Sequence, residues 1–138
     1  MASVTERTYE TVDATPAENA QIAVNFLKAA VAGKAHEMMR RYGAPDFVHH
    51  NPFFAAGADT ISTAMDDDAR ANPDKVFDIQ RTIAEGPFVV VHSRLRQRSG
   101  EPDMATVHIF RIEDGHIREL WDIGQAAPPD SPNPHAMF

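Results

Sequence analysis

Apolar residues in the first part of the chain recur with the period of an α-helix. They are Ile22, Ala23, Phe26, Leu27 and Ala30, which share one helix face. Thr15 and Glu18 have the spacing of a capping box, and Pro16 stands where a helix needs no N–H donor. Gly33 suits the position just after a helix end. This pattern predicts a helix that begins at Pro16 and ends before Gly33.

Two further helices are predicted before the middle of the chain. They cover Lys34–Tyr42 and Ala58–Ala71, and the second has its own apolar face. Between them Phe47–Asn51 is predicted to be extended or strand-like, and Pro52 disfavours helix at the residue before it. The run Asp66–Asp68 cannot converge on one metal ion, since three consecutive helical residues fan over about 200°. We expect these carboxylates to form a solvated helix face.

The second half of the chain changes to strand-like patterns. Four β-rich runs are separated by short turns: Val76–Ala84, Phe88–Arg98, Met104–Glu113 and His116–Gln125. Short turns between strands predict an antiparallel meander, and helices followed by strands predict an α+β domain with the helices over one sheet face. We assign this domain to residues 15–125, between a flexible arm at 1–14 and a Pro-rich, extended arm at 126–138.

The Asp114-Gly115 pair predicts a two-residue hairpin that fixes the register of the last two strands. Counting back from this turn places His108 opposite Trp121, with Phe110 on the same face. Asp122 then faces away, unless a β-bulge turns it inward. A sheet face with His108 and Trp121 among apolar neighbours is typical of a pocket wall.

Two more histidines are candidates for the same pocket. One of the two strand registers allowed by the turn at 99–103 places His92 beside Phe110, and we adopt it. Arg94 would lie nearby and could pair with a substrate carboxylate or an internal acid. His50 and its neighbour in the sequence should point to opposite faces of an extended segment. We expect His50, His92 and His108 to share a cavity, since titratable groups in apolar clefts mark functional sites. The other histidines, His36, His116 and His135, are expected to be structural or solvated.

Composition narrows the class of protein. The chain of 138 residues has no cysteine, which excludes disulfides, thiolate metal sites and a cysteine nucleophile. A net charge of −7 argues against nucleic-acid binding, which depends on neutralising phosphates. No apolar run approaches the roughly 20 residues that cross a bilayer, and the N-terminus lacks the apolar stretch of a signal peptide. We therefore expect a cytoplasmic protein of one domain.

Several segments together resemble SnoaL-like proteins of the nuclear transport factor 2-like superfamily. They are His50-Asn51-Pro52, Val89–Ser93, His108–Asp122 and the final Met137-Phe138. This superfamily includes polyketide cyclases, ketosteroid isomerases and limonene epoxide hydrolases. The resemblance implies a cone-shaped, cystatin-like α+β roll, with a curved sheet and helices around an apolar cavity, usually in a homodimer. It also implies that cyclases carry a carboxylate at the position of His108, where it acts as acid and base in an aldol closure.

The first functional hypothesis is an enzyme without a cofactor, either a cyclase (a lyase) or an isomerase, acting on a carbonyl-containing or cyclic hydrophobic substrate. His108 would move the proton, because imidazole titrates near neutral pH. Asn51, His50 or His92 would hydrogen-bond the developing enolate. The pocket walls and substrate contacts are assigned to Trp121, Phe110, Phe53, Phe54, Arg94 and, if a bulge turns it inward, Asp122.

Two alternatives have the same cavity. In the first, the protein binds a small molecule without reacting with it, because a fold alone does not fix function. In the second, which we rank lower, His50, His92 and His108 hold a transition metal. We also predict a homodimer through the sheet face away from the helices, because that face would otherwise expose a large apolar patch. Its residues would be Val89, Val91, Leu95, Ile109 and Leu120.

Overall fold

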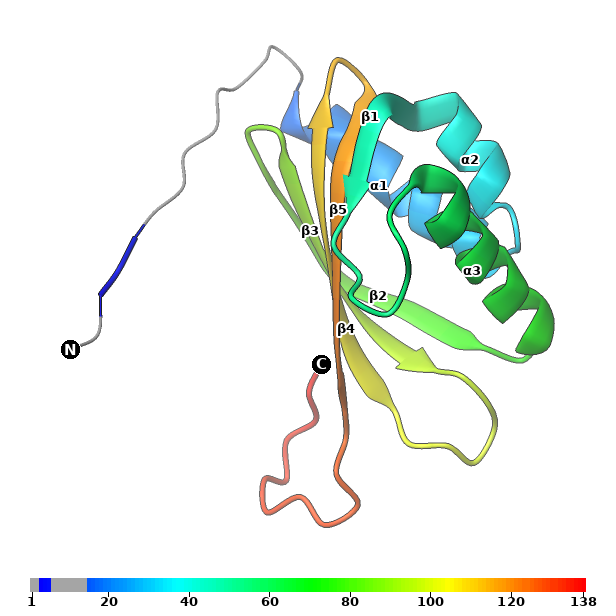
Figure 1. Cartoon of the computed structure of the whole chain (residues 1–138). Helices are drawn as coiled ribbons and strands as arrows, with labels where there is room; N and C mark the ends of the chain where they lie inside the picture. The colour runs from blue at the N-terminus through cyan, green and yellow to red at the C-terminus, as the bar shows by residue number, and fades with distance from the viewer. Residues whose placement is uncertain (1–2, 6–14) are drawn as a thin grey trace.

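Three helices lie together on one face of a five-stranded sheet in the computed structural model, which describes residues 3–5 and 15–138 (Figure 1). The helices are α1 (Pro16–Val31), α2 (Ala35–Tyr42) and α3 (Ala58–Ala71). The strands are β1 (Gly43–His49), β2 (Val76–Glu85), β3 (Phe88–Arg96), β4 (Met104–Glu113) and β5 (His116–Ala126). The predicted α+β class is confirmed. Most of the predicted arm at 1–14 lies outside the described residues.

The sheet has the order β1-β5-β4-β3-β2. Strands β2 to β5 form the predicted antiparallel meander. The segment predicted as extended or strand-like, 47–51, belongs largely to β1, which pairs in parallel with β5. The sheet is therefore mixed. Because β1 reaches β5 only as far as the pair His49 and Leu120, the rest of β5 is a free edge.

The first helix begins and ends for the reasons that the sequence indicates. The Thr15 hydroxyl accepts a hydrogen bond from the backbone N–H of Glu18 at 3.3 Å. Gly33 has a φ of +79°, in the left-handed region that glycine adopts most easily. The apolar face of α1 is buried against the sheet, where Phe26 meets Phe110 edge to face at 5.9 Å between ring centroids.

Asp66 corrects the expectation of a solvated acidic face on α3. Its side chain is buried, and its carboxylate accepts hydrogen bonds from the backbone N–H groups of Ala35 at 2.7 Å and His36 at 3.3 Å. These donors begin α2, whose own N-cap residue Lys34 makes no side-chain cap. Burial alone would raise the pKa of Asp66, but hydrogen bonds from His36 and the backbone hold it below its usual value. A carboxylate from one helix thus caps another.

A β-bulge changes the register of the final hairpin. The turn has the predicted form, with positive φ at both Asp114 (51°) and Gly115 (74°). Ile112 still faces Ile117, but Arg111 then faces Glu119, so Arg118 is an extra residue on β5. Beyond this point each residue of β5 faces a residue one place later in β4 than the turn alone predicts.

The bulge separates the two residues on which the predicted pocket depended. His108 faces Asp122, whereas Trp121 faces Ile109 on the other side of the sheet. The prediction that His108 and Trp121 line one cavity is therefore wrong. The alternative in which a bulge turns Asp122 inward is the arrangement found.

The register of β3 against β4 also differs from the one adopted. Val91 faces His108 and His92 faces Val107, so His92 lies on the side away from the helices. The predicted dimer face is wrong for the same reason, because Val89, Val91 and Leu120 are buried in the helix-covered core. We call the opposite side, which carries Phe88, Val90, His92, Val107, Ile109, Trp121 and Ile123, the outer face of the sheet.

The C-terminal arm is extended and folds back toward the sheet, as Figure 1 shows. Its last residues reach the outer face. The His92 imidazole donates a hydrogen bond from Nε2 to the carbonyl of Met137 at 3.0 Å. The Phe138 ring lies 6.5 Å from the His92 ring and 5.9 Å from the Arg94 guanidinium carbon. The apolar end of the chain thus covers part of its own outer face.

Candidate functional site

The helix-facing side of the central strands changes from apolar to polar along its length. The first row across β3, β4 and β5 is apolar and at most 1% exposed, and consists of Val89, Phe110 and Leu120. The second row holds Val91, His108 and Asp122, and the third holds Ser93, Thr106 and Gly124. Successive rows are two residues apart, or about 7 Å along a strand. Polar residues therefore begin where the sealed core ends.

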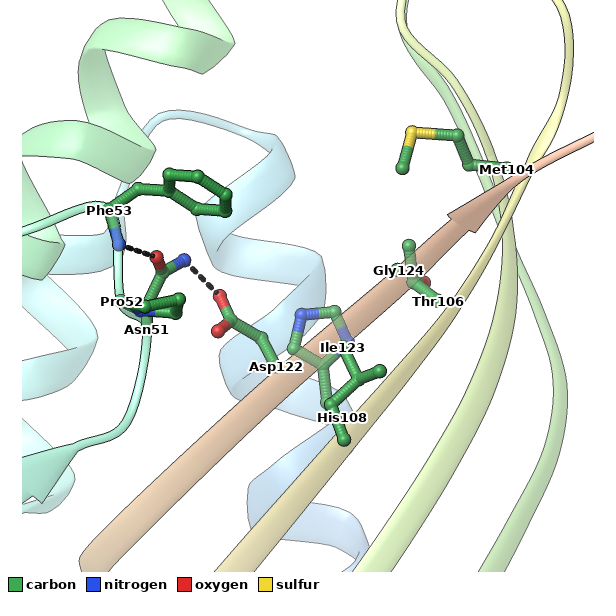
Figure 2. Close-up of a pocket in the computed structure, with 9 residues that line it drawn as sticks. All are labelled: Asn51, Pro52, Phe53, Met104, Thr106, His108, Asp122, Ile123 and Gly124. Atoms are coloured by element: carbon green, nitrogen blue, oxygen red, sulfur yellow. Dashed lines mark hydrogen bonds between the residues drawn. The ribbon is translucent and has the colours of Figure 1, made fainter.

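A pocket of about 260 Å³ opens at these polar rows (Figure 2). It lies where β1 has ended and the edge of β5 is free. The lining residues are Asn51, Pro52, Phe53, Met104, Thr106, His108, Asp122, Ile123 and Gly124. Asp122 is the charged member of this set at neutral pH, and none of the lining residues is Lys or Arg.

Asn51 joins the loop after β1 to the catalytic candidates on the sheet. Its side-chain oxygen accepts a hydrogen bond from the backbone N–H of Phe53 at 2.9 Å, which is the turn that Asn side chains favour. Its amide nitrogen then donates to Asp122 Oδ2 at 2.9 Å (Figure 2). The amide thus holds one carboxylate oxygen in place.

The environment of His108 keeps its imidazole neutral. Burial lowers the pKa of His108 to about 4, and the nearby Asp122 carboxylate offsets only part of this effect. The ring packs near Phe77 and Phe110, at 6.1 and 6.5 Å between centroids. At neutral pH the ring therefore carries one N–H donor and one acceptor nitrogen.

Two atoms of this pair have no hydrogen-bond partner within the described part of the chain. They are His108 Nδ1 and Asp122 Oδ1, both buried. Buried polar atoms in native proteins are nearly always paired, so each unpaired atom needs an explanation. Here both belong to residues that line one pocket, which is typical of a binding or catalytic site.

His50 and Trp121 lie together on the outer face instead of in the pocket. Their rings stack at 4.6 Å with an interplanar angle of 4°. His50 Nε2 donates to Glu119 Oε2 at 2.7 Å. It is His49 that points inward, because its partner Leu120 faces the helices, and its ring donates to the carbonyl of Ala55 at 2.8 Å. The sequence correctly predicts one histidine on each side, but assigns them in reverse.

His92 and Arg94 also stay outside the pocket. His92 accepts a hydrogen bond from the Arg81 guanidinium and contacts the C-terminal arm. Arg94 pairs with Asp103 at 3.0 Å, so the internal acid that we considered for it is Asp103. Both residues were placed in the pocket by the wrong strand register, and the structure gives neither a contact with it.

The phenylalanines predicted to form the pocket walls lie in three different places. Phe110 is fully buried beside His108 and belongs to the core row. Phe53 lines the pocket while remaining 87% exposed, and Phe54 is 45% exposed outside the lining set. The pocket therefore has an exposed aromatic edge, Phe53, on the loop after β1, whereas Phe110 lies in the core outside the lining set.

The lining residues that sequence reasoning did not name are Pro52, Met104, Thr106, Ile123 and Gly124. Met104, Thr106 and Gly124 follow from the same alternation that places His108 inward, since they are two or four residues away from a pocket residue on their own strand. The alternation of side chains along β4 and β5 is visible in the sequence, but it identifies lining residues only when the register between these two strands is known.

The alternative of a metal held by His50, His92 and His108 is wrong. His108 lies on the helix-facing side, whereas His50 and His92 are on the outer face. Across residues 3–5 and 15–138, no group of three or more His, Asp or Glu side chains is placed to hold an ion. Within the same residues, no helix is long and apolar enough to cross a bilayer.

Comparisons with known proteins agree with this architecture. The chain is similar to AclR from Streptomyces galilaeus, described as a candidate hydroxylase, with 19% identity, a TM-score of 0.65 and coverage of 80% of this chain and 91% of AclR. A candidate SnoaL-like polyketide cyclase from Jannaschia sp. CCS1 has 18% identity, a TM-score of 0.66 and coverage of 82% and 90%. A candidate ketosteroid isomerase from Kribbella flavida has 18% identity, a TM-score of 0.66 and coverage of 89% of both chains.

These likenesses concern the fold. No curated protein sequence matches the chain significantly. The sequence pattern of the SnoaL-like domain matches residues 23–120, which include the second half of α1, all of α2 and α3, most of the sheet and His108. Solved NTF2-like proteins from Cytophaga hutchinsonii and Mesorhizobium loti share the same arrangement. The fold is therefore NTF2-like, and the chain belongs to the SnoaL-like domain family.

Proposed function

We propose that this protein is an enzyme that moves a proton next to a carbonyl group, in a cyclase or isomerase type of reaction. The observation that carries the proposal is the pairing of His108 with Asp122. They are cross-strand neighbours in one pocket, and each keeps a buried polar atom without a partner among the described residues. A carboxylate beside a neutral imidazole is suited to general acid and base chemistry.

The geometry gives the two residues different roles. Asp122 Oδ1 would take a proton from the carbon next to the carbonyl, while Asn51 holds Oδ2. The electrons of the broken C–H bond form an enolate, whose oxygen gains negative charge. The N–H of neutral His108 would donate to this oxygen, a kind of stabilisation worth about 3 kcal/mol when the donor is preorganised. This moves the base from His108, as the sequence suggested, to its partner.

The enolate can then react in two ways that both return the proton. An enolate conjugated with a C=C double bond can take the proton back from Asp122 at a more distant carbon, which is an isomerisation. Alternatively, the enolate carbon attacks a second carbonyl, which closes a ring, and the proton on Asp122 goes to the new alkoxide oxygen. The relatives named above are described as a candidate cyclase and a candidate isomerase. Both reactions share one step, which is removal of a proton next to the carbonyl to form an enolate.

Exchange of hydrogen for deuterium tests this shared step without the natural substrate. Cyclohexanone, 1-indanone and 2-tetralone would be incubated with the protein in deuterated buffer, and loss of the proton signals next to the carbonyl followed by NMR. We expect exchange faster than in buffer for at least one ketone. Asp122→Asn should slow it by about 10²- to 10⁴-fold, the usual contribution of a positioned base.

Matched variants separate this role from general damage. Glu119→Gln changes an acid of the outer face that is paired with His50, and His116→Gln changes an exposed histidine at the turn. Both should exchange like the wild type. Exchange at the buffer rate for all three ketones, or an unchanged rate in Asp122→Asn, contradicts the proposal.

A further inference from the structure

The third row of the helix-facing side contains a buried hydroxyl that the proposed reaction does not use. Thr106 is 7% exposed and lines the pocket, yet its Oγ1 has no hydrogen-bond partner in the described segments. Thr106 lies two residues before His108 on β4, on the same side of the strand. Its hydroxyl thus belongs to the pocket but stands about 7 Å from the proton-handling row.

The residue opposite Thr106 on β5 is glycine, and this leaves space above the hydroxyl. Thr106 pairs with Gly124, which also lines the pocket. A Cβ atom added to Gly124 would lie 3.0 Å from Cε of Met104 and would meet no other side chain within 4 Å. Only the flexible end of Met104 therefore shares this space, and methionine side chains adapt readily to what they contact.

The charge of the pocket restricts what can enter. Asp122 supplies a negative charge, and no Lys or Arg belongs to the lining set. An anionic group would meet repulsion from this carboxylate without a cation to offset it. A neutral group that can hydrogen-bond would pair with the Thr106 hydroxyl and would not be repelled by the Asp122 carboxylate.

From these observations we infer that Thr106, Gly124 and Met104 form a second polar subsite, which selects an uncharged substrate with a hydroxyl or second carbonyl about 7 Å from its reacting carbonyl. Gly124 gives the group room, Met104 moves to cover it, and the Thr106 hydroxyl donates to it or accepts from it. The inference rests on the proposed function only for the statement that the other carbonyl lies at His108 and Asp122.

Binding of two small ketones of equal shape tests the subsite. 4-Hydroxyacetophenone and 4-methylacetophenone differ by a hydroxyl in place of a methyl group at the end of the ring opposite the carbonyl. Their affinities would be measured from NMR shifts of the protein backbone in slightly acidic buffer, where the phenol is neutral. The wild type should bind the hydroxyl compound about fivefold more tightly, the ratio that one neutral hydrogen bond contributes.

Two variants separate the hydroxyl contact from the space around it. Thr106→Val keeps the shape of the side chain and should reduce the ratio to about one. Gly124→Ala should weaken both ketones and leave the ratio in place, because it removes room and no hydrogen bond. Thr82→Val, on the same sheet side but outside the lining set, is the matched control and should keep the wild-type ratio.

The outcomes distinguish the subsite from the proposed reaction. An unchanged ratio in Thr106→Val, an unchanged affinity in Gly124→Ala, or no binding of either ketone by the wild type overturns the subsite. So does equally tight binding of anionic 4-acetylbenzoate. Because this experiment measures binding, a wild type that binds with the expected ratio but exchanges no protons contradicts the proposed function and leaves the subsite standing.

Discussion

The two faces of the sheet each hold a histidine near an acidic residue, and only one of these pairs is left chemically available. On the outer face, His50 donates to Glu119 at 2.7 Å and stacks on Trp121. Burial alone would raise the pKa of Glu119, but hydrogen bonds from His50 and Arg111 hold it below its usual value. This pair is satisfied within the protein and partly exposed to solvent.

On the helix-facing side, His108 and Asp122 are neighbours with buried atoms that no described residue pairs. Burial lowers the pKa of His108 to about 4, so the ring is neutral where most proteins work. The same residue types thus form a structural contact on one face and a reactive pair on the other. The difference lies in whether the protein itself satisfies their polar atoms.

The largest expected contrast between the two faces is in stability. Phe110→Ala removes a ring that is fully buried in the apolar row and should lower the free energy of unfolding by about 3–5 kcal/mol. Trp121→Ala removes a partly exposed ring from the outer face. At protein concentrations too low for association, it should lower the free energy of unfolding by less than Phe110→Ala does. Denaturant unfolding followed by circular dichroism measures both. Equal losses would show that the outer face is as much a part of the core as the helix-facing side.

The second contrast concerns acid. His108 has its pKa lowered from 6.5 in the unfolded chain to about 4, so the unfolded state takes up its proton first as the pH falls. Its contribution to stability is present above pH 6.5 and is lost between pH 6.5 and 4, by about 3 kcal/mol at about 1.4 kcal/mol per unit.

Stability curves of matched variants isolate this contribution. His108→Gln should lose less stability than the wild type over that pH range, measured by denaturant unfolding at each pH. His116→Gln, which changes an exposed histidine at the turn, is the matched control. A His108→Gln curve parallel to the wild type would mean that the ring is solvated.

The smallest contrast is in association. The homodimer remains a prediction, now moved to the outer face, where Ile83 and Ile123 are 58% and 60% exposed. Ile83→Lys places a charge on this face, away from the pocket, and should weaken the dimer about tenfold, as judged by sedimentation across a concentration series. Lys substituted for exposed Phe53, on the pocket loop, should leave association unchanged. A wild type that sediments at the mass of one chain at all concentrations contradicts the dimer.

The helices and strands could be predicted from the sequence, but the register between neighbouring strands could not. Helix starts such as Thr15-Pro16 and the turn at Asp114-Gly115 are decided by neighbouring residues, and all three helices and four strands are where local patterns predict them. The family resemblance added the overall architecture. These features depend on interactions within a few residues.

Which side chains face the pocket could not be predicted, because it depends on a single inserted residue in β5. Arg118 is the extra residue of the bulge, and nothing in its side chain distinguishes it from a regular strand residue. Because strand side chains alternate, this one-residue shift exchanges Trp121 for Asp122 in the pocket. The longer turn at 99–103 likewise left the register between β3 and β4 open, and with it the side of the sheet on which His92 lies. Of the predicted site residues, the structure places Asn51, Phe53 and His108 at the pocket, whereas Asp122 reaches it only because of the bulge.

The most direct test of the account is the titration of the His108 ring followed by NMR of its nitrogen and carbon signals, with His50→Gln and His92→Gln used to assign the peaks. Because this ring lies in the buried polar row beside Asp122, we expect a midpoint near pH 4. Asp122→Asn should shift the midpoint lower still, since the carboxylate raises the pKa of His108. A midpoint at or above 6.5, or one that is the same in Asp122→Asn, would contradict the shared site.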